Sequence, residues 1–206
     1  YLSKGDTDSA IDYNKQALAL APKWVYGYVN LSKAYYARYE KGTDPEKKAA
    51  DLARSRDYAA QALEIAPSNP DAIAVDASFF ALDGKTDEAI ARFKAAFDAV
   101  DTVDRRNYVL WLFKAGQMES NAGKWQASIA TLSKVVLLDD KNGEAYFRLA
   151  MAYGILGDTT QSLSMYQLAR QYADPKNEQL QHDLARFESQ LATPGQAAPE
   201  APATTP

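Results

Sequence analysis

Few residues in this chain carry the chemistry that catalysis or metal binding needs. The sequence of 206 residues has no cysteine and a single histidine, His182. Disulfides, cysteine nucleophiles and thiolate metal sites are therefore excluded, and several histidines cannot share a metal. No pattern suited to a catalytic triad accompanies His182. We expect it to be a surface or groove-edge residue, with a ligand contact as the alternative.

Two segments superficially suggest ligand loops. The stretch GQMESNAGK (116–124) resembles a phosphate loop, but its glycines are too far apart, a tryptophan follows the lysine, and we expect a helix end there. Asp98, Asp101 and Asp104 are spaced by three residues without a glycine turn, whereas calcium loops alternate their ligands by two. No pair of carboxylates is accompanied by the residues that a glycosidase or a metal site would need. The sequence predicts a protein that is not an enzyme, with no cofactor and no metal.

Composition narrows the class of protein further. Hydrophobic residues make up 47% and aromatic residues 11% of the chain, enough to bury a core. The formal net charge is -4 and no basic stripe is present, so we expect no nucleic-acid partner. No run of about 18 apolar residues occurs, so we expect no segment that spans a membrane.

A recurring phrase dominates the sequence. It opens with a glycine in four copies, at Gly5, Gly84, Gly123 and Gly157, and a fifth copy, 55–67, lacks the glycine. The phrases end 45, 34, 39 and 34 residues apart, at Pro22, Pro67, Asp101, Asp140 and Asp174. Glycine is suited to end a helix in the left-handed conformation, and proline cannot continue a helix interior. Each phrase therefore predicts a turn followed by a second helix.

The residues before each glycine predict a first helix. Large and small residues recur there at positions 0, +3, +4 and +7, which is one stripe of a helix. These residues are Tyr28, Leu31, Ser32, Tyr35; Ile73, Asp76, Ala77, Phe80; Leu112, Ala115, Gly116, Glu119; and Tyr146, Leu149, Ala150, Tyr153. Small residues recur in the second helices at Ala10, Ser55, Ala89, Ser128 and Ser162. They should let the two helices of a pair approach closely.

The pattern of large, small and aromatic positions, the turn glycine and the closing proline resemble the tetratricopeptide-repeat family. The resemblance covers about 174 of the 206 residues. It implies an all-α fold, a right-handed α-solenoid of stacked antiparallel helix pairs with a C-terminal capping helix. Asp76 and Glu119 depart from the usual leucine and aromatic. We expect their carboxylates to tilt toward solvent, and the alternative is a buried polar contact.

The repeat phase predicts the organisation of the chain. We expect a partial repeat at 1–22, whose missing first helix would lie upstream of Tyr1, and a solenoid that continues to residue 191. The complete repeats are 23–67, 68–101, 102–140 and 141–174, followed by a capping helix over 175–191 and a disordered Ala/Pro/Thr-rich tail over 192–206. An 11-residue insertion in 23–67 should lengthen both of its helices by about five or six residues. A shorter one near 102–108 should extend the next helix at its start.

The resemblance implies that first helices line a concave groove that binds a partner. The predicted groove residues are Tyr26, Asn30, Lys33, Val75, Ser78, Phe113, Lys114, Gln117, Phe147, Arg148 and Met151. Members that bind heat-shock chaperones hold two carboxylates with lysine and arginine, but Asp71 and Val75 occupy those positions here. Because Asp71 would repel a carboxylate, we expect a different ligand.

The expected function is a scaffold or adaptor, bacterial in composition, that binds a protein or peptide partner in this groove. The alternatives are a structural spacer that self-associates and a regulatory module of a larger enzyme. The sequence does not decide the compartment. The tail resembles the tails of bacterial envelope proteins, which favours the envelope or periplasm, and a cytoplasmic location is the alternative.

Overall fold

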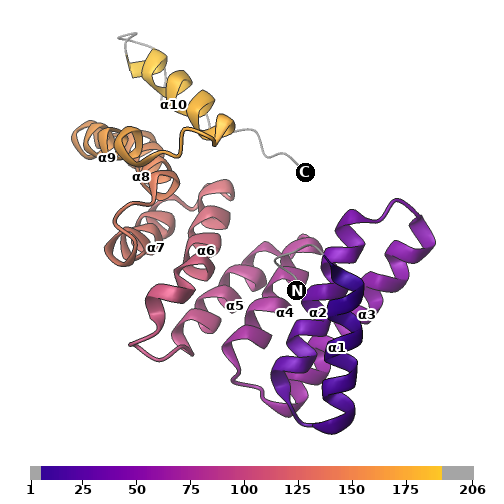
Figure 1. Ribbon diagram of the computed structural model, residues 1–206. Helices are drawn as coiled ribbons and strands as arrows, with labels where there is room; N and C mark the ends of the chain where they lie inside the picture. The colour runs from indigo at the N-terminus through magenta and orange to yellow at the C-terminus, as the bar shows by residue number, and fades with distance from the viewer. Residues whose placement is uncertain (1–5, 192–206) are drawn as a thin grey trace. The chain divides into compact units, whose positions relative to one another are not determined.

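The computed structural model describes residues 6–191, and within that range every regular element is a helix (Figure 1). The all-α prediction is confirmed. The chain divides into two compact units, one ending at Ala99 and the other beginning at Val100. The first unit contains α1 (Thr7–Leu20), α2 (Val25–Lys41), α3 (Pro45–Ile65), α4 (Pro70–Leu82) and α5 (Thr86–Asp98). The second contains α6 (Val109–Asn121), α7 (Trp125–Leu138), α8 (Gly143–Ile155), α9 (Thr159–Tyr172) and α10 (Glu178–Leu191).

Consecutive helices form pairs in both units. The pairs are α2–α3 and α4–α5 in the first unit, with α1 packed against α2, and α6–α7 and α8–α9 in the second. Gly84, Gly123 and Gly157 end the first helix of three pairs with φ between 71° and 83°. The amide of the following residue bonds back five residues, as Lys124 does to the carbonyl of Glu119 at 2.8 Å. Glycine is needed there because that φ is strained for other residues.

A serine hydroxyl joins the two helices in three of the pairs. Ser162 of α9 donates to the carbonyl of Ala150 in α8 at 2.7 Å, and Ser128 of α7 donates to that of Gly116 in α6 at 3.1 Å. Ser55 and Ser32 exchange such bonds in the pair α2–α3, each hydroxyl donating to the other's carbonyl at 2.7 Å. The repeat pattern predicts small residues at the positions of these four serines and of their partners Ala150 and Gly116.

The space between paired helices admits nothing larger at these positions. A Cβ added to Gly116 would lie 2.6 Å from Cδ2 of Leu132, a side chain that is fully buried. At the start of α8, a Cβ on Gly143 would lie 2.7 Å from the backbone of Tyr172 and Ala173. Small residues therefore set how closely each pair packs, because interiors have no room for an extra methyl.

The larger insertion lengthens its two helices unequally. With α2 at 17 residues and α3 at 21, against 13 each for α4 and α5, most of the extra length lies in the second helix. The expectation of about equal lengthening is therefore wrong. Asp44 accepts bonds from the amides of Glu46 and Lys47, and Pro45 occupies the first helical position, which starts α3 early.

Two other helix starts differ from the prediction. The segment before α6 forms a turn, in which Asp101 accepts from the amide of Val103, and then a 3-10 helix, Arg105–Tyr108, rather than an α-helical extension. Helix α10 begins at Glu178 instead of residue 175, because Asn177 caps it by accepting from the amide of Leu180 at 3.1 Å. The expected tail, 192–206, lies outside the described residues.

The two unusual carboxylates have different surroundings. Glu119 is only 2% exposed, so the expectation that it tilts toward solvent is wrong. Asp76 is half-buried and lies 2.6 Å from Nη1 of Arg92 in α5. Burial raises the pKa of Asp76, an effect that the nearby Arg92 and Arg56 only partly offset.

None of the described helices is long and apolar enough to cross a membrane.

Replacing Ser162 tests the hydroxyl bond between paired helices. Ser162→Ala should lower the free energy of unfolding by about 1 kcal/mol, because a buried hydrogen bond is lost. Ser162→Val should lower it by roughly 1–3 kcal/mol more, because the larger side chain has no space. Ser164→Ala, an exposed site on the same helix, should change little. Urea unfolding followed by circular dichroism measures all three, and equal stability of the Ala and Val variants would contradict the tight contact.

Asp76 gives a pH-dependent prediction. A carboxyl whose pKa is raised by folding destabilises the folded state once it ionises, so its cost appears as pH rises above the ordinary value of 3.8. The free energy of unfolding of Asp76→Asn, relative to that of the wild type, should therefore increase from pH 4 toward neutrality. Denaturant unfolding at several pH values measures this, and a gap that shrinks with rising pH would contradict burial as the dominant effect.

Candidate binding surfaces

The predicted groove residues of the first unit lie in two stripes. Tyr26, Asn30 and Lys33 are spaced by four and three residues along α2, and α4 carries Val75 and Ser78. The two first helices contact each other, and Nζ of Lys33 lies 3.0 Å from Oδ1 of Asp71 at the start of α4. Tyr26 is 47% exposed and Lys33 is exposed, while the other three are half-buried.

The ion pair changes the argument about Asp71. Only 14% of its side chain is exposed, and the ammonium of Lys33 compensates its charge. The carboxylate therefore repels an acidic ligand less than its sequence position suggests. Nothing in the sequence signals this pair, because Lys33 and Asp71 are 38 residues apart.

In the second unit a polar network links the first helices. Oε1 of Glu144 in α8 accepts from Nε2 of Gln117 in α6 at 3.3 Å and from Nη2 of Arg148 at 3.2 Å. Arg148 also donates from Nη1 to Oδ1 of Asn121 at 3.2 Å. The structure thus brings the predicted residues Gln117 and Arg148 together through Glu144, which the prediction missed. The spacing of Glu144 and Arg148, four residues apart on a helix, was the available signal.

The predicted apolar anchors of the second unit are buried. Phe113 is 9%, Phe147 5% and Met151 2% exposed. The ring of Phe147 lies 5.9 Å from that of Phe187 in α10, edge to face, so the capping helix covers this part of α8. Lys114 is exposed. The accessible part of the predicted groove residues is therefore polar in this unit.

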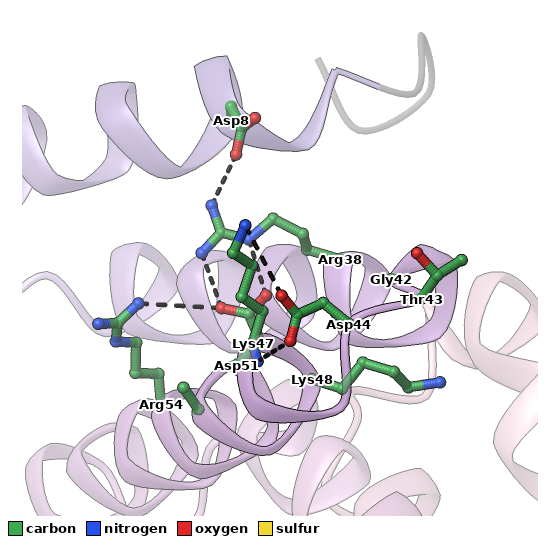
Figure 2. A pocket seen from close by; sticks show the side chains of 10 residues that line it. Asp8, Arg38, Gly42, Thr43, Asp44, Lys47, Lys48, Asp51 and Arg54 are labelled. Carbon is green, nitrogen blue, oxygen red and sulfur yellow. Dashed lines mark hydrogen bonds and ion pairs between the residues drawn. The ribbon is translucent and has the colours of Figure 1, made fainter.

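A hollow of about 570 Å³ lies elsewhere in the first unit, where α1 meets the enlarged pair, which is the pair α2–α3 that the insertion lengthens (Figure 2). Residues of three helices and of the loop before α3 line it, and four are basic and three acidic: Asp8, Arg38, Gly42, Thr43, Asp44, Lys47, Lys48, Ala50, Asp51 and Arg54. The insertion supplies most of this wall.

Arg38 holds the base of the hollow together. It donates from Nε and Nη2 to the two oxygens of Asp51 at 2.9 and 2.7 Å, and from Nη1 to Asp8 at 2.6 Å. The hydrogen bond to Asp51, and secondarily that to Asp8, raises the pKa of Arg38. Asp51 is buried, so this two-pronged pair balances a charge that would be costly alone. The guanidinium also lies 5.0 Å from the ring centre of the buried Tyr35.

The other segments that suggest ligand chemistry have the following surroundings in the structure. The stretch 116–124 is the end of α6 and its glycine turn, so its backbone does not form a phosphate loop. The side chain of His182 is 76% exposed on α10. Within residues 6–191, no group of three acidic or histidine side chains is placed to hold a metal ion.

Solved structures share this fold. No protein-family model and no curated protein sequence matches the chain. Pseudomonas aeruginosa PilF is similar at a TM-score of 0.69 and 16% identity, covering 95% of this chain and 88% of its own. MamA is similar at a TM-score of 0.62 and 20% identity, covering 84% of this chain and 92% of its own. The type IV pilus biogenesis factor PilW is similar at a TM-score of 0.65 and 14% identity, covering 95% of this chain and 90% of its own.

These neighbours are tetratricopeptide-repeat proteins, and their structural similarity supports the fold that the sequence resemblance implies. The chain therefore has the tetratricopeptide-repeat fold, an all-α helical repeat.

Removing Arg38 tests the base of the hollow. Arg38→Met should lower the free energy of unfolding by roughly 2–3 kcal/mol, because the buried Asp51 loses its charge partner. The double variant Arg38→Met, Asp51→Leu should lose less than Arg38→Met alone, since no buried charge is left. Arg54→Met, which removes a more exposed cation 3.9 Å from Asp51, is the control and should change stability slightly. Additive losses in the double variant would show that the pair is not coupled.

Proposed function

We propose that this chain is a non-catalytic adaptor that holds an extended segment or a helix of a protein partner on the faces of its first helices. The observation that carries the proposal is the stripe on α2, where Tyr26 is 47% exposed and shares one helix face with Asn30 and Lys33. Aromatic side chains that are half exposed on a rigid element are effective anchors for a partner.

The chemistry of the stripe suits a peptide. The ring of Tyr26 offers apolar contact with a polar tip, and the amide of Asn30 can both donate to and accept from a peptide backbone. The neighbouring Lys33–Asp71 pair is polar but nearly balanced in charge. Shape and backbone hydrogen bonding, rather than strong charge, should therefore select the partner in the first unit.

The second unit contributes differently. Its exposed Lys114 and the network of Gln117, Glu144 and Arg148 offer polar contacts, while α10 covers the apolar side chain of Phe147. We propose that this face of the second unit supports binding through hydrogen bonds.

A matched pair of double variants tests the adaptor role. Tyr26→Ala with Asn30→Ala removes two side chains one helical turn apart on the groove face of α2. Ile65→Ala with Gln61→Ala removes an exposed pair at the same spacing on α3, a second helix. Partner proteins captured from an extract of the source cells should fall roughly tenfold, or about 1.4 kcal/mol, with the first pair and stay unchanged with the second.

Circular dichroism should show both double variants folded, since none of the four side chains is buried. Equal recovery of the same partners by the wild type and the Tyr26, Asn30 variant would remove the groove face from the proposal. Loss with the α3 pair alone would move the binding surface to the second helices.

A further inference from the structure

We propose that the hollow where α1 meets the enlarged pair α2–α3 is a second docking surface, which takes an acidic segment of a protein partner. Its rim cations, Lys47, Lys48 and Arg54, come from α3, and its floor joins Arg38 of α2 to carboxylates of α1 and α3. It therefore does not use the groove stripe of Tyr26 and Asn30. The inference goes beyond the adaptor role proposed above and can hold or fail independently of it.

Arg38, the cation of the floor, is already paired. All three nitrogens of the Arg38 guanidinium donate to Asp51 or Asp8 at 2.6–2.9 Å. A ligand would therefore not compete for Arg38, because the buried Asp51 would lose its partner. The floor instead gives a rigid base of one cation and two carboxylates, so any attraction for an acidic ligand has to come from the other basic side chains of the hollow.

The cations on the rim are held much more loosely. Nζ of Lys47 lies 3.9 Å from Asp44, and Nη1 of Arg54 lies 3.9 Å from Asp51, both beyond hydrogen-bond length. Their side chains are 83% and 56% exposed. Lys48 adds a third cation, whose ammonium lies 4.9 Å from the ring centre of Tyr39. Lys47, Lys48 and Arg54 outnumber the one rim carboxylate, Asp44. The whole lining has four basic and three acidic side chains, a local excess of one positive charge in a chain of net charge -4, and the rim would attract carboxylates.

The spacing of the rim fits an extended acidic segment. Lys47 and Arg54 are seven residues apart on α3, which places them on one face about 10.5 Å apart along the helix. In the extended conformation common to unstructured chains, residues three apart share a side and are separated by about 9 Å. The residue between the two cations in sequence that lines the same hollow, Ala50, is exposed and has a small side chain.

A pair of labelled peptides tests the inference. The probe is fluorescein-Gly-Ser-Glu-Ser-Gly-Glu-Ser-Gly, whose acids are three residues apart. Its comparison, Gly-Ser-Ser-Glu-Glu-Gly-Ser-Gly, has the same composition with adjacent acids. Fluorescence anisotropy with the full chain, at about 20 mM and then 150 mM salt, should show at least threefold tighter binding of the spaced peptide and weaker binding at high salt. Absence of binding, or equal binding of the two peptides, would overturn the proposal.

Charge-matched variants locate the peptide. Lys47→Gln with Arg54→Gln should weaken binding of the spaced peptide at least fivefold. Lys134→Gln with Lys141→Gln, which removes the same charge from exposed sites in the second unit, should change it less than twofold. Equal weakening by both pairs would indicate long-range attraction and overturn the site. The Tyr26→Ala, Asn30→Ala protein should bind the peptide normally, and a loss there would place the peptide in the groove instead.

Discussion

The contact between small residues of paired helices is the constraint on which the rest of this structure depends. Serine hydroxyls of second helices bond to backbone carbonyls of first helices in three pairs, at 2.7–3.1 Å. Helices can approach this closely only where side chains are small, and at Gly116 even a methyl group would collide with Leu132. The contact fixes the rotation of each first helix. It thereby decides which side chains pack inside and which remain on the face that a partner could reach.

That constraint explains why the two units present different surfaces. In the first unit the α2 stripe keeps Tyr26 accessible, and the insertion adds the charged hollow without disturbing the Ser32–Ser55 contact. In the second unit the same face of α8 is covered by α10, with Phe187 against Phe147. One repeat design therefore yields an aromatic stripe with a nearby cationic rim in one unit, and a polar network beside a capping helix in the other.

The sequence predicts the fold well because the repeat is local. Turn glycines and small positions follow from spacing within about 34 residues, and Gly84, Gly123 and Gly157 end first helices as expected. Features that depend on distant partners could not be predicted. The Lys33–Asp71 pair, the bonds from Arg38 to Asp51 and Asp8, and the burial of Phe147 by α10 join residues with no sequence relation. Capping by Asn177 and the turn at Asp101 shifted two helix starts.

Native-state hydrogen exchange measured residue by residue in low concentrations of denaturant tests the central claim most directly. If the small-residue contact holds each pair together, amides near Ser162 in α9 and near Ala150 in α8 should lose protection together, with the same opening free energy and the same denaturant dependence. The pair at Ser128 and Gly116 should do likewise. Contradiction would come from first helices that open at a clearly lower free energy than their second helices, because the contact would then not be what unites the pair.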